Sequence, residues 1–424
     1  MAKYSARIVD KILLRKLQGK GAILVEGAKW CGKTTTATQV AKNVLKLGDP
    51  ATLRANLELA NMDPRLLLHG SVPKLIDEWQ LIPELWDAVR SEVDDRNSLG
   101  QFILTGSAVP PQTDKIHHTG TGRIGRLMMR TMSLYESGDS NGAISLHNLF
   151  ENPETIFAEN DIDIERLAYL VCRGGWPQAT FMKGNVALDQ AFDYYDAVVH
   201  NDSSRVDDVK RDPNRVKSLM RSYARHQGAA VNYSTIRADM IANDEDSLNE
   251  NTVASYISAL KKIFVIEDLP AWNPNLRSKT AIRTSDTRYY TDPSIGVAAL
   301  GLGPKDFMND LNTFGLFFET MAIRDLRVFA ESIDGSVYHY RDKNGLECDA
   351  VVHLRNGSYG LIEIKLGGEH LIEEGARNLL ALEKKIDTTR MQAPAFKMVL
   401  IGVGPYAYRR KDGIYVVPIG TLKD

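Results

Sequence analysis

The segment Gly27–Thr34, with the residues GAKWCGKT, constrains the fold of this chain most strongly, because it matches the pattern G-x-x-x-x-G-K-[ST]. The apolar stretch Ala22–Glu26 precedes it and a helical pattern follows it. Glycines let such a loop curl so that its backbone N–H groups point at an anion, and the N-terminus of the following helix favours negative charge. We therefore expect an α/β domain in which a phosphate-binding loop connects a strand to a helix.

The residue types in this loop predict that it binds ATP together with Mg²⁺. The Lys33 ammonium can reach the β- and γ-phosphates, and the Thr34 hydroxyl can ligate Mg²⁺. The pair Trp30-Cys31 is bulky and soft for such a loop, which permits the backbone cradle but leaves the turnover rate open. The predicted nucleotide contacts are Gly27, Ala28, Lys29, Trp30, Cys31, Gly32, Lys33, Thr34 and Thr35.

A second part of the same site is predicted at Lys74–Glu78, an apolar strand that ends in two carboxylates. Asp77 is expected to hold the Mg²⁺ shell. Glu78 is expected to act as the general base that polarises the attacking water. The alternative is a strand that simply ends in solvated acids.

Four segments carry a resemblance to a known family: VEGAKWCGKTT, LIDEWQLIPELWDAVR, FILTGSA and GRIGR. They resemble a bacterial and archaeal branch of AAA-type ATPases, in which a C-terminal domain of unknown function follows the ATPase. The resemblance covers nearly the whole chain and implies ATP binding. Because AAA-type proteins can form rings, it also allows a homo-oligomer.

This resemblance extends to the strand Phe102–Ser107, which in AAA-type ATPases lies between the two strands described above. Its end residue, Thr105 or Ser107, could orient the water near the γ-phosphate; a plain turn is the alternative, since Thr and Ser favour turns. An arginine near the γ-phosphate would stabilise transition-state charge. Arg123 is the first choice and Arg126 the second, in cis or in trans, and surface arginines are the alternative.

Hydrophobic periodicity gives the expected elements of the N-terminal region, which predict a parallel α/β sheet. The expected helices are residues 4–17, 33–47 and 83–96, and the expected strands are residues 22–26, 51–56, 74–77, 101–105 and 128–134.

The middle of the chain changes character after about residue 150. Residues 160–230 are expected to be mainly helical, and residues 231–300 suit a winged helix-turn-helix with the strands 265–269 and 287–291. Its second helix, Glu250–Ile263, would turn four polar side chains to DNA: Asn251, Thr252, Ser255 and Lys262. The basic content is thin, so a helical lid or a protein-interaction module is the alternative.

From about residue 304 the pattern is α/β again, with helices at 314–329 and 373–385 and strands at 337–341, 347–354, 358–365 and 397–402. Glu363 and Lys365 share one strand face, and a hairpin turn can bring Asp349 beside them. Carboxylates bind a hard cation such as Mg²⁺, and a nearby lysine can orient water for phosphodiester attack.

This order of residues resembles the PD-(D/E)xK nuclease fold, with Asp349, Glu363 and Lys365 as its motif. The resemblance implies that Glu319 is the helix acid of its RecB-like branch, so the predicted metal ligands are Glu319, Asp349 and Glu363. Glu347 faces the same way as Asp349 and is an alternative ligand. The other interpretation is a solvated strand face on which Glu and Lys pair across the sheet.

Composition limits the remaining choices for this chain of 424 residues. The expected domains are 1–150 (AAA-type), 151–303 (helical and winged helix) and 304–424 (nuclease-like). A formal net charge of −2 gives no global attraction to nucleic acid or membrane. Three widely spaced cysteines and the absence of a long apolar stretch predict a cytoplasmic protein without a membrane span.

The function predicted from these residues is ATP hydrolysis that controls a C-terminal domain directed at DNA. The alternative is a nucleotide-dependent switch whose C-terminal domain is a non-catalytic interaction module. A small-molecule kinase is less favoured, because Asp77-Glu78 suits hydrolysis and the C-terminal half would have no role.

Overall fold

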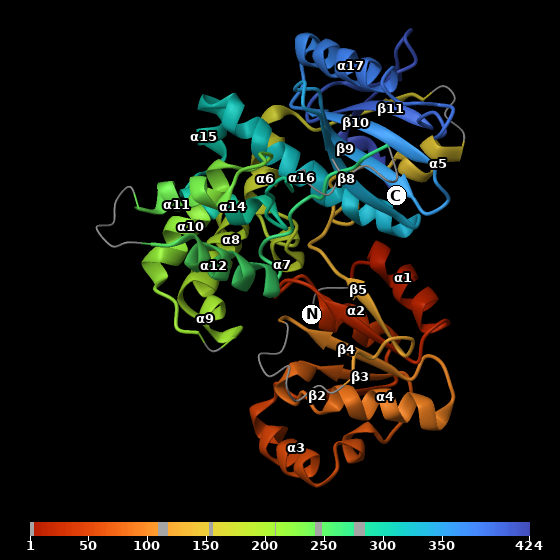
Figure 1. Ribbon diagram of the computed structural model, residues 1–424, viewed down its shortest axis with the longest axis vertical. Coiled ribbons are helices and arrows are strands. Elements are labelled where there is room, and N and C mark those ends of the chain that lie inside the picture. The colour runs from red at the N-terminus through yellow and green to blue at the C-terminus, as the bar shows by residue number, and fades with distance from the viewer. Residues whose placement is uncertain (1–3, 109–117, 152–155, 208, 242–247, 275–284) are drawn as a thin grey trace. The chain divides into compact units, whose positions relative to one another are not determined.

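The computed structural model describes residues 4–108, 118–151, 156–207, 209–241, 248–274 and 285–424. The chain forms two compact units (Figure 1). The first contains residues 1–131, 198–211 and 258–265, and the second contains 132–197, 212–257 and 266–424. The N-terminal stretch of the unit with the P-loop therefore ends at Thr131, ahead of the boundary expected near residue 150, and two later segments join the same unit. The three-domain division stays a prediction.

The first unit is built on a five-stranded sheet in which every pairing is parallel, as the alternating pattern predicts. Its spatial order is β2 (Asn43–Lys46), β3 (Lys74–Asp77), β4 (Phe102–Gly106), β1 (Ala22–Glu26) and β5 (Ile124–Met128). In this register Thr105 lies opposite both Val25 and Asp77. The carboxyl ends of β1, β3 and β4 thus meet at one edge, where ligands bind in parallel sheets.

Helices cover this sheet and close its core. They are α1 (Ile8–Leu17), α2 (Lys33–Val40), α3 (Pro50–Met62) and α4 (Leu85–Arg96), with short 3-10 turns at Pro64–Leu68 and Trp79–Leu81. Trp79 and Trp86 pack with their ring centroids 5.1 Å apart inside a cluster that includes Leu24, Ile76 and Leu104. The segment 198–211, grouped with this unit, contains the π-helix Val198–Asp202 and α9 (Ser203–Arg205).

Three predicted elements of this unit were wrong. The helix expected to reach Leu47 ends at Val40, because the edge strand β2 pairs with β3 over Asn43–Lys46. The strand expected at residues 51–56 belongs to α3, where Asp49 caps the first turn and Pro50 occupies its first position. The strand expected at 128–134 is instead β5, whose length is set by its pairing with the five residues of β1.

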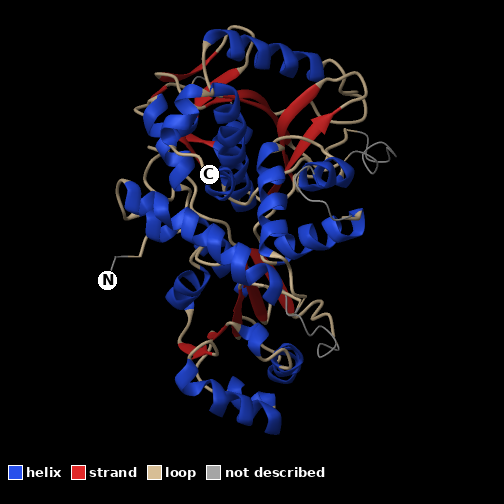
Figure 2. Ribbon diagram, turned by 90° about the vertical axis from the view of Figure 1, so that its left-hand side faces the viewer, coloured by secondary structure: helices blue, strands red, loops and turns tan. Residues whose placement is uncertain are grey.

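The second unit combines helices with a seven-stranded sheet, and Figures 1 and 2 show α17 along one face of that sheet. Its helices are α5 (Leu146–Glu151), α6 (Ile164–Arg173), α7 (Pro177–Thr180), α8 (Asn185–Ala197), α10 (Pro213–Arg225), α11 (Tyr233–Ile241), α14 (Pro293–Leu300), α15 (Pro304–Asn309), α16 (Leu311–Ser332) and α17 (Glu369–Glu383). Helix α12 (Glu250–Lys262) begins in this unit, and its last residues are grouped with the first.

The sheet of this unit is mixed and larger than the sequence pattern predicted. Its order is β7 (Ala158–Glu159), β12 (Tyr406–Arg409), β13 (Tyr415–Pro418), β11 (Phe396–Ile401), β10 (Tyr359–Lys365), β9 (Glu347–Leu354) and β8 (Gly335–Arg341). Strands β10, β11 and β13 are parallel, and the others pair antiparallel. A separate pair joins β6 (Ile144–Ser145) to β14 (Leu422–Lys423). Residues 144–145 and 158–159 therefore pair with strands from the C-terminal part of the chain.

The region predicted as a winged helix contains α11 and α12, followed by two antiparallel bridges, Ile266 with Tyr290 and Leu269 with Thr287. These bridges replace the two continuous strands that were expected. Residues 242–247 of the expected turn lie outside the described part of the chain. The winged helix stays a prediction.

A buried ionic network holds the segment that follows α6. The Arg324 guanidinium lies 3.0 Å from Asp292 and 2.7 Å from Asp325, and all three side chains are buried. Asp292 also accepts the backbone N–H of Gly175 at 2.9 Å, and Trp176 donates to Ser294 at 2.9 Å. The Gly174-Gly175-Trp176 turn is therefore a structural junction within this unit. No helix among the described residues is long and apolar enough to cross a bilayer.

Candidate active site

The P-loop runs from the end of β1 to the start of α2, and its backbone requires glycine at two positions. Gly27 has φ = 153°, and a Cβ there would lie 2.0 Å from the carbonyl oxygen of Met129. Gly32, the N-cap of α2, has φ = 104°. Trp30 also adopts a positive φ of 65° and is 55% exposed. The loop thus has the curled conformation that the pattern predicts.

The Lys33 ammonium is buried and is held by carbonyl oxygens of its own loop. Nζ donates to the carbonyl oxygen of Gly27 at 2.8 Å and to that of Ala28 at 2.7 Å. These contacts keep the cation beside the loop backbone, where an anion on the backbone N–H groups would also lie. A triphosphate could replace these carbonyl partners, because its oxygens carry more negative charge and would bind the ammonium more strongly.

Asp77 joins the P-loop helix to the two central strands. Its Oδ1 accepts a hydrogen bond from the Thr34 hydroxyl at 2.7 Å and another from the Thr105 hydroxyl at 2.6 Å. The three residues come from the start of α2 and the ends of β3 and β4. The structure therefore brings together three residues that were singled out from separate segments.

Glu78 follows Asp77 and turns its carboxylate to a different set of partners. Its backbone adopts φ = 57° and ψ = 45°, which is uncommon for a glutamate. Gln80 donates a hydrogen bond to Oε2 of Glu78, and the Ser107 hydroxyl donates to the same atom at 3.2 Å. Gln80 was not among the predicted site residues, although it lies only two positions from Glu78.

In the second unit, Asp349, Glu363 and Lys365 lie together on β9 and β10, and Glu319 of α16 lies close enough for their charges to shift its pKa. Lys365 Nζ lies 2.8 Å from Glu363 Oε2 and 3.5 Å from Asp349 Oδ2. Asp349 also accepts the backbone N–H of Ile364 at 2.7 Å. Glu319, from α16, accepts a hydrogen bond from Tyr289, which was not predicted. We call Glu319, Asp349, Glu363 and Lys365 the carboxylate cluster.

Burial and mutual repulsion hold protons in this cluster. Burial, reinforced by the charge of Asp349, raises the pKa of Glu319 and of Glu363 to about 8. Burial lowers the pKa of Lys365, but Asp349 and Glu363 outweigh it and keep that pKa above its usual value. The 2.8 Å ion pair alone would favour ionised Glu363. The pKa of Glu363 is nevertheless raised, because its side chain is almost fully buried and the nearby ammonium is shared with Asp349.

Three family matches divide the chain. Residues 164–306 match Domain of unknown function (DUF8612), and residues 314–422 match Domain of unknown function (DUF4143). Residues 19–137 match the family described as AAA domain, and this match includes the P-loop, Asp77, Glu78 and Thr105. We call residues 19–137 the AAA domain, after the family that they match. This match supports the prediction of an AAA-type P-loop domain in the N-terminal region, and the family implies nucleotide binding.

The similarity of this chain to two curated proteins extends beyond the AAA domain. The uncharacterized proteins Mb2031c of Mycobacterium bovis and Rv2008c of Mycobacterium tuberculosis are each 21% identical over 413 residues, which is 97% of this chain and 82% of theirs. Among solved structures, a Walker-type ATPase of Pyrococcus abyssi matches 68% of this chain and 94% of its own, with 15% identity and a TM-score of 0.42. A STAND protein with a tetratricopeptide repeat sensor from Pyrococcus horikoshii matches 78% and 50%, with 14% identity and a TM-score of 0.25.

The two candidate arginines of the AAA domain lie at different places on its sheet. Arg123 precedes β5, its carbonyl oxygen accepts the N–H of Ala22 at the start of β1, and its guanidinium lies 2.7 Å from Asp94. Arg123 thus lies at the amino ends of the strands, whereas the P-loop follows the carboxyl end of β1. It therefore does not face the nucleotide site of its own chain. Arg126 lies along β5, 3.0 Å from Glu26, the last residue of β1. The catalytic role of either arginine stays a prediction.

Two further residues support the P-loop of the AAA domain and have no sequence motif that could have identified them. Arg7 is buried and donates to the carbonyl oxygen of Cys31 at 3.0 Å and to that of Arg130 at 2.9 Å. Asp202, from the π-helix grouped with this unit, lies 2.5 Å from the Lys29 ammonium. Both contacts join segments far apart in sequence, so only the folded chain reveals them.

The residues of the two candidate metal sites differ in how well they fit a cation. In the AAA domain, a hydroxyl and a carboxylate meet at 2.7 Å beside the phosphate loop, which is the donor set of a magnesium nucleotide. In the carboxylate cluster, the Lys365 ammonium lies between the acids, and no group of three or more His, Cys, Asp or Glu among the described residues could hold a metal ion. As placed, the cluster does not fit Mg²⁺, and its ligand role stays a prediction. The alternative ligand Glu347 lies 3.0 Å from Arg341 on the strand edge.

Proposed function

We propose that this protein is an ATPase that binds ATP with Mg²⁺ and hydrolyses it in the AAA domain. The observation that carries the proposal is the convergence of Thr34 and Thr105 on Oδ1 of Asp77, at 2.7 and 2.6 Å. It places the P-loop helix, the acid and a polar strand end together at the carboxyl edge of a parallel sheet. A chance match to the loop pattern would not require these three segments to meet.

Each residue has a definite task in this proposal. The backbone N–H groups of 27–34 bind the phosphates, and Lys33 moves from its carbonyl partners to the β- and γ-phosphate oxygens. Thr34 and Asp77 would hold Mg²⁺, which when bound neutralises phosphate charge. Glu78 orients and deprotonates the attacking water, while Gln80 and Ser107 fix its carboxylate.

An arginine from a second copy of the chain would complete this site. Arg123 lies away from the P-loop of its own chain, and its side chain is half exposed. It could therefore reach into the nucleotide site of a second copy of the chain. Arg126 remains the candidate in cis, because it lies beside the end of β1. We therefore propose a homo-oligomer whose formation raises the hydrolysis rate.

Phosphate release by the full chain tests this function. We expect Mg²⁺-dependent release by wild type, loss of it in Lys33→Ala, and loss of it with nucleotide binding retained in Glu78→Gln. Lys42→Ala, an exposed lysine just after α2, is the matched control and should behave as wild type. Release by Lys33→Ala that equals wild type would overturn the proposal.

A second candidate function concerns the carboxylate cluster, which we propose as a nuclease-like site directed at DNA. Its support is that Lys365 lies 2.8 Å from Glu363 and 3.5 Å from Asp349, and that the buried Oε1 of Glu363 has no hydrogen-bond partner among the described residues. A buried oxygen without a partner is costly unless something else binds it. The alternative is a non-catalytic interaction module, in which the ion pairs of Lys365 with Glu363 and Asp349 are purely structural.

Two measurements separate these possibilities. Plasmid and single-stranded DNA incubated with Mg²⁺ or Mn²⁺ should be cut by wild type and spared by Glu363→Ala if the nuclease proposal holds; equal cutting by both would indicate contamination. For the winged-helix region, a DNA mobility shift that weakens with salt and is lost in Lys262→Ala would support DNA contact through α12. Lys262 lies 3.9 Å from Asp207, so its charge is already partly balanced.

A further inference from the structure

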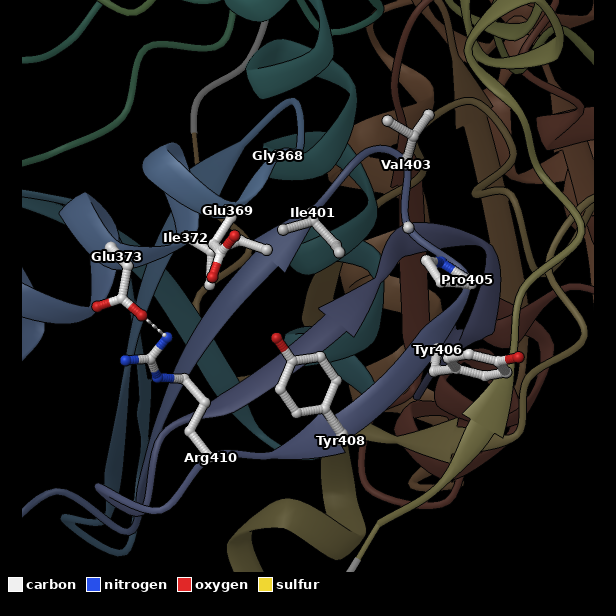
Figure 3. Close-up of a pocket in the computed structure, with 11 residues that line it drawn as sticks. Gly368, Glu369, Ile372, Glu373, Ile401, Val403, Pro405, Tyr406, Tyr408 and Arg410 are labelled. Carbon is white, nitrogen blue, oxygen red and sulfur yellow. Dashed lines mark hydrogen bonds and ion pairs between the residues drawn. The ribbon is translucent and has the colours of Figure 1, made fainter.

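A pocket of about 380 Å³ opens beside the N-terminus of α17, at the carboxyl end of β11. Ile372 from the helix and Ile401, Val403 and Pro405 from the strand and its loop supply the apolar lining (Figure 3). Tyr406 and Tyr408 from β12 form the aromatic wall, and Figure 3 shows the Tyr408 hydroxyl turned toward α17. The pocket therefore has an apolar and aromatic interior that can take an aliphatic stem.

The charged residues of this pocket leave it acidic. Glu369 and Glu373 lie on α17, and Arg410 lies 2.6 Å from Glu373. Two carboxylates and one guanidinium give the lining a formal charge of −1. Arg410 also lies 3.0 Å from Asp412, so its positive charge is shared between two acids. The hydrogen bond from Arg410 holds the pKa of Glu373 below its usual range, which keeps that carboxylate ionised.

Exposed aromatic rings continue from the pocket onto the edge of the sheet. Tyr406 is 46% exposed and Tyr408 is 40% exposed. The register through β13 and β11 places both rings on the face of the sheet that α17 covers, but beyond the part that the helix shields. Phe157 is 69% exposed and stacks on Tyr406 with ring centroids 5.5 Å apart. Exposed rings gathered in one place commonly mark an interaction surface, and Tyr and Phe are enriched at protein interfaces.

We propose that this pocket binds a lysine or arginine side chain of a partner protein, whose neighbouring apolar residues pack on the Phe157–Tyr406 rings. The aliphatic stem would lie on Ile372 and Ile401, and the cationic head would meet Glu369 and the face of Tyr408. Carboxylates and aromatic faces both attract a cation. The same charges disfavour a nucleic acid, because the lining holds more carboxylates than guanidinium groups and Arg410 is already paired.

The pocket is distinct from the carboxylate cluster but adjoins it. Ile401 in the pocket lies opposite Lys365 in the parallel register of β10 and β11. A bound partner would therefore lie one strand away from the cluster, on the same face of the sheet. This proposal goes beyond ATP hydrolysis and does not depend on it, since the pocket is formed entirely by residues 368–410.

The test uses the full chain without nucleotide and a labelled peptide, acetyl-Gly-Leu-Lys-Leu-Gly-amide. Its lysine provides the cation, and its leucines provide the apolar flanks. A peptide with norleucine in place of lysine keeps the stem and removes the ammonium. We expect saturable binding of the lysine peptide, and about tenfold weaker binding of the norleucine peptide, because the cation–aromatic and carboxylate contacts are both lost.

Variants at the pocket locate the effect. Glu369→Gln and Tyr408→Leu should each weaken binding of the lysine peptide about threefold. Each should also reduce the difference in affinity between the lysine peptide and the norleucine peptide. Glu374→Gln, on the same helix but outside the lining, is the matched control and should leave both peptides unchanged. Thermal unfolding confirms that each variant is folded.

Three outcomes would overturn the proposal. The first is no saturable binding of the lysine peptide up to about 1 mM. The second is equal affinity for the two peptides, or a higher affinity for the lysine peptide that is unchanged in both pocket variants. The third is a labelled thymidine oligonucleotide that binds the chain and loses affinity in Tyr408→Leu, which would make nucleic acid the occupant.

Discussion

The Thr34 hydroxyl donates a hydrogen bond to Oδ1 of Asp77 at 2.7 Å, although these residues lie 43 positions apart. The contact links the first turn of the P-loop helix to the end of β3. The Thr105 hydroxyl shares the same oxygen at 2.6 Å, so the neighbouring strand β4 is tied to it as well. Oriented in advance, the carboxylate would need little rearrangement to hold a cation at the phosphates.

Replacing Asp77 should therefore remove the metal dependence of the site. In Asp77→Asn we expect Mg²⁺-dependent phosphate release to fall by about two orders of magnitude or more, because the anionic ligand is lost. Thr105→Val removes one hydrogen bond and should cost only about fivefold. Nucleotide titrations with and without Mg²⁺ measure the first effect, and Asp95→Asn on α4 is an exposed control. Wild-type Mg²⁺ dependence in Asp77→Asn would contradict the assignment.

Trp30 should report nucleotide binding through its fluorescence. It lies in the P-loop and is 55% exposed, whereas the other four tryptophans of the chain, Trp79, Trp86, Trp176 and Trp272, are buried. A nucleotide on this loop would change the surroundings of Trp30 far more than those of the others. We expect a saturable change in emission on adding ATP that is absent in Trp30→Phe and retained in Trp272→Phe. A change that persists in Trp30→Phe would place the nucleotide elsewhere.

The parts of the fold that the sequence predicted are those fixed by local pattern. The P-loop needs glycine at positions 27 and 32 for its backbone angles, so its conformation is carried by a few adjacent residues. Strand β9 follows from its alternating side chains and matches its expected bounds, Glu347–Leu354. The hairpin with β10 then brings Asp349 beside Glu363, as expected from a period of two.

The elements and contacts that the sequence did not predict depend on residues far away in the chain, which no local sequence pattern indicates. Asn43–Lys46 is a strand because β3 lies beside it, and its own pattern did not distinguish it from the end of a helix. Arg123 was proposed from a motif, but the register of β5 with β1 places it at the far edge of the sheet. Tyr289 reaches Glu319 from a segment 30 residues away, without a motif. The Asp49-Pro50 capping signal, in contrast, was present in the sequence and could have identified α3.

Gln80 should act as a positioning residue for Glu78. It donates a hydrogen bond to Oε2 of Glu78, and its own Oε1 is buried without a hydrogen-bond partner in the described part of the chain. Its side-chain amide is therefore placed to hold the Glu78 carboxylate. In Gln80→Ala we expect hydrolysis to fall about tenfold with nucleotide affinity unchanged, because only the carboxylate's orientation is disturbed. Gln80→Glu would place a second acid beside Glu78 and should shift the pH profile of hydrolysis upward, which a purely structural role would not do. Equal loss of affinity and rate would contradict a positioning role.

Arg324 should be a principal determinant of stability in the second unit. Arg324→Leu would leave Asp292 and Asp325 buried without their cation, at a cost of about 3–5 kcal/mol. Adding Asp292→Asn should recover part of this loss, since one of the two uncompensated charges is removed. The matched control is Arg341→Leu, which breaks an exposed pair with Glu347 and should cost less than about 1 kcal/mol. Thermal unfolding of the full chain measures all three, and similar losses for Arg324→Leu and Arg341→Leu would contradict this view.

Asp325 gives the same network a pH dependence with a definite sign. Burial raises its pKa from the usual 3.8 to about 6, although Arg324 and the backbone N–H of Leu134 oppose the shift. The folded chain therefore binds this proton more tightly than the unfolded chain, so the stabilisation is fully present below about pH 4 and is lost as the pH rises through 6. Asp325→Asn cannot titrate, so the stability of wild type relative to this variant should fall by up to about 1.4 kcal/mol per pH unit across that window. Denaturant unfolding at pH 4.5, 5.5 and 7 would show this, and a relative stability that instead rises with pH would mean that Arg324 dominates and that the carboxyl is ionised throughout.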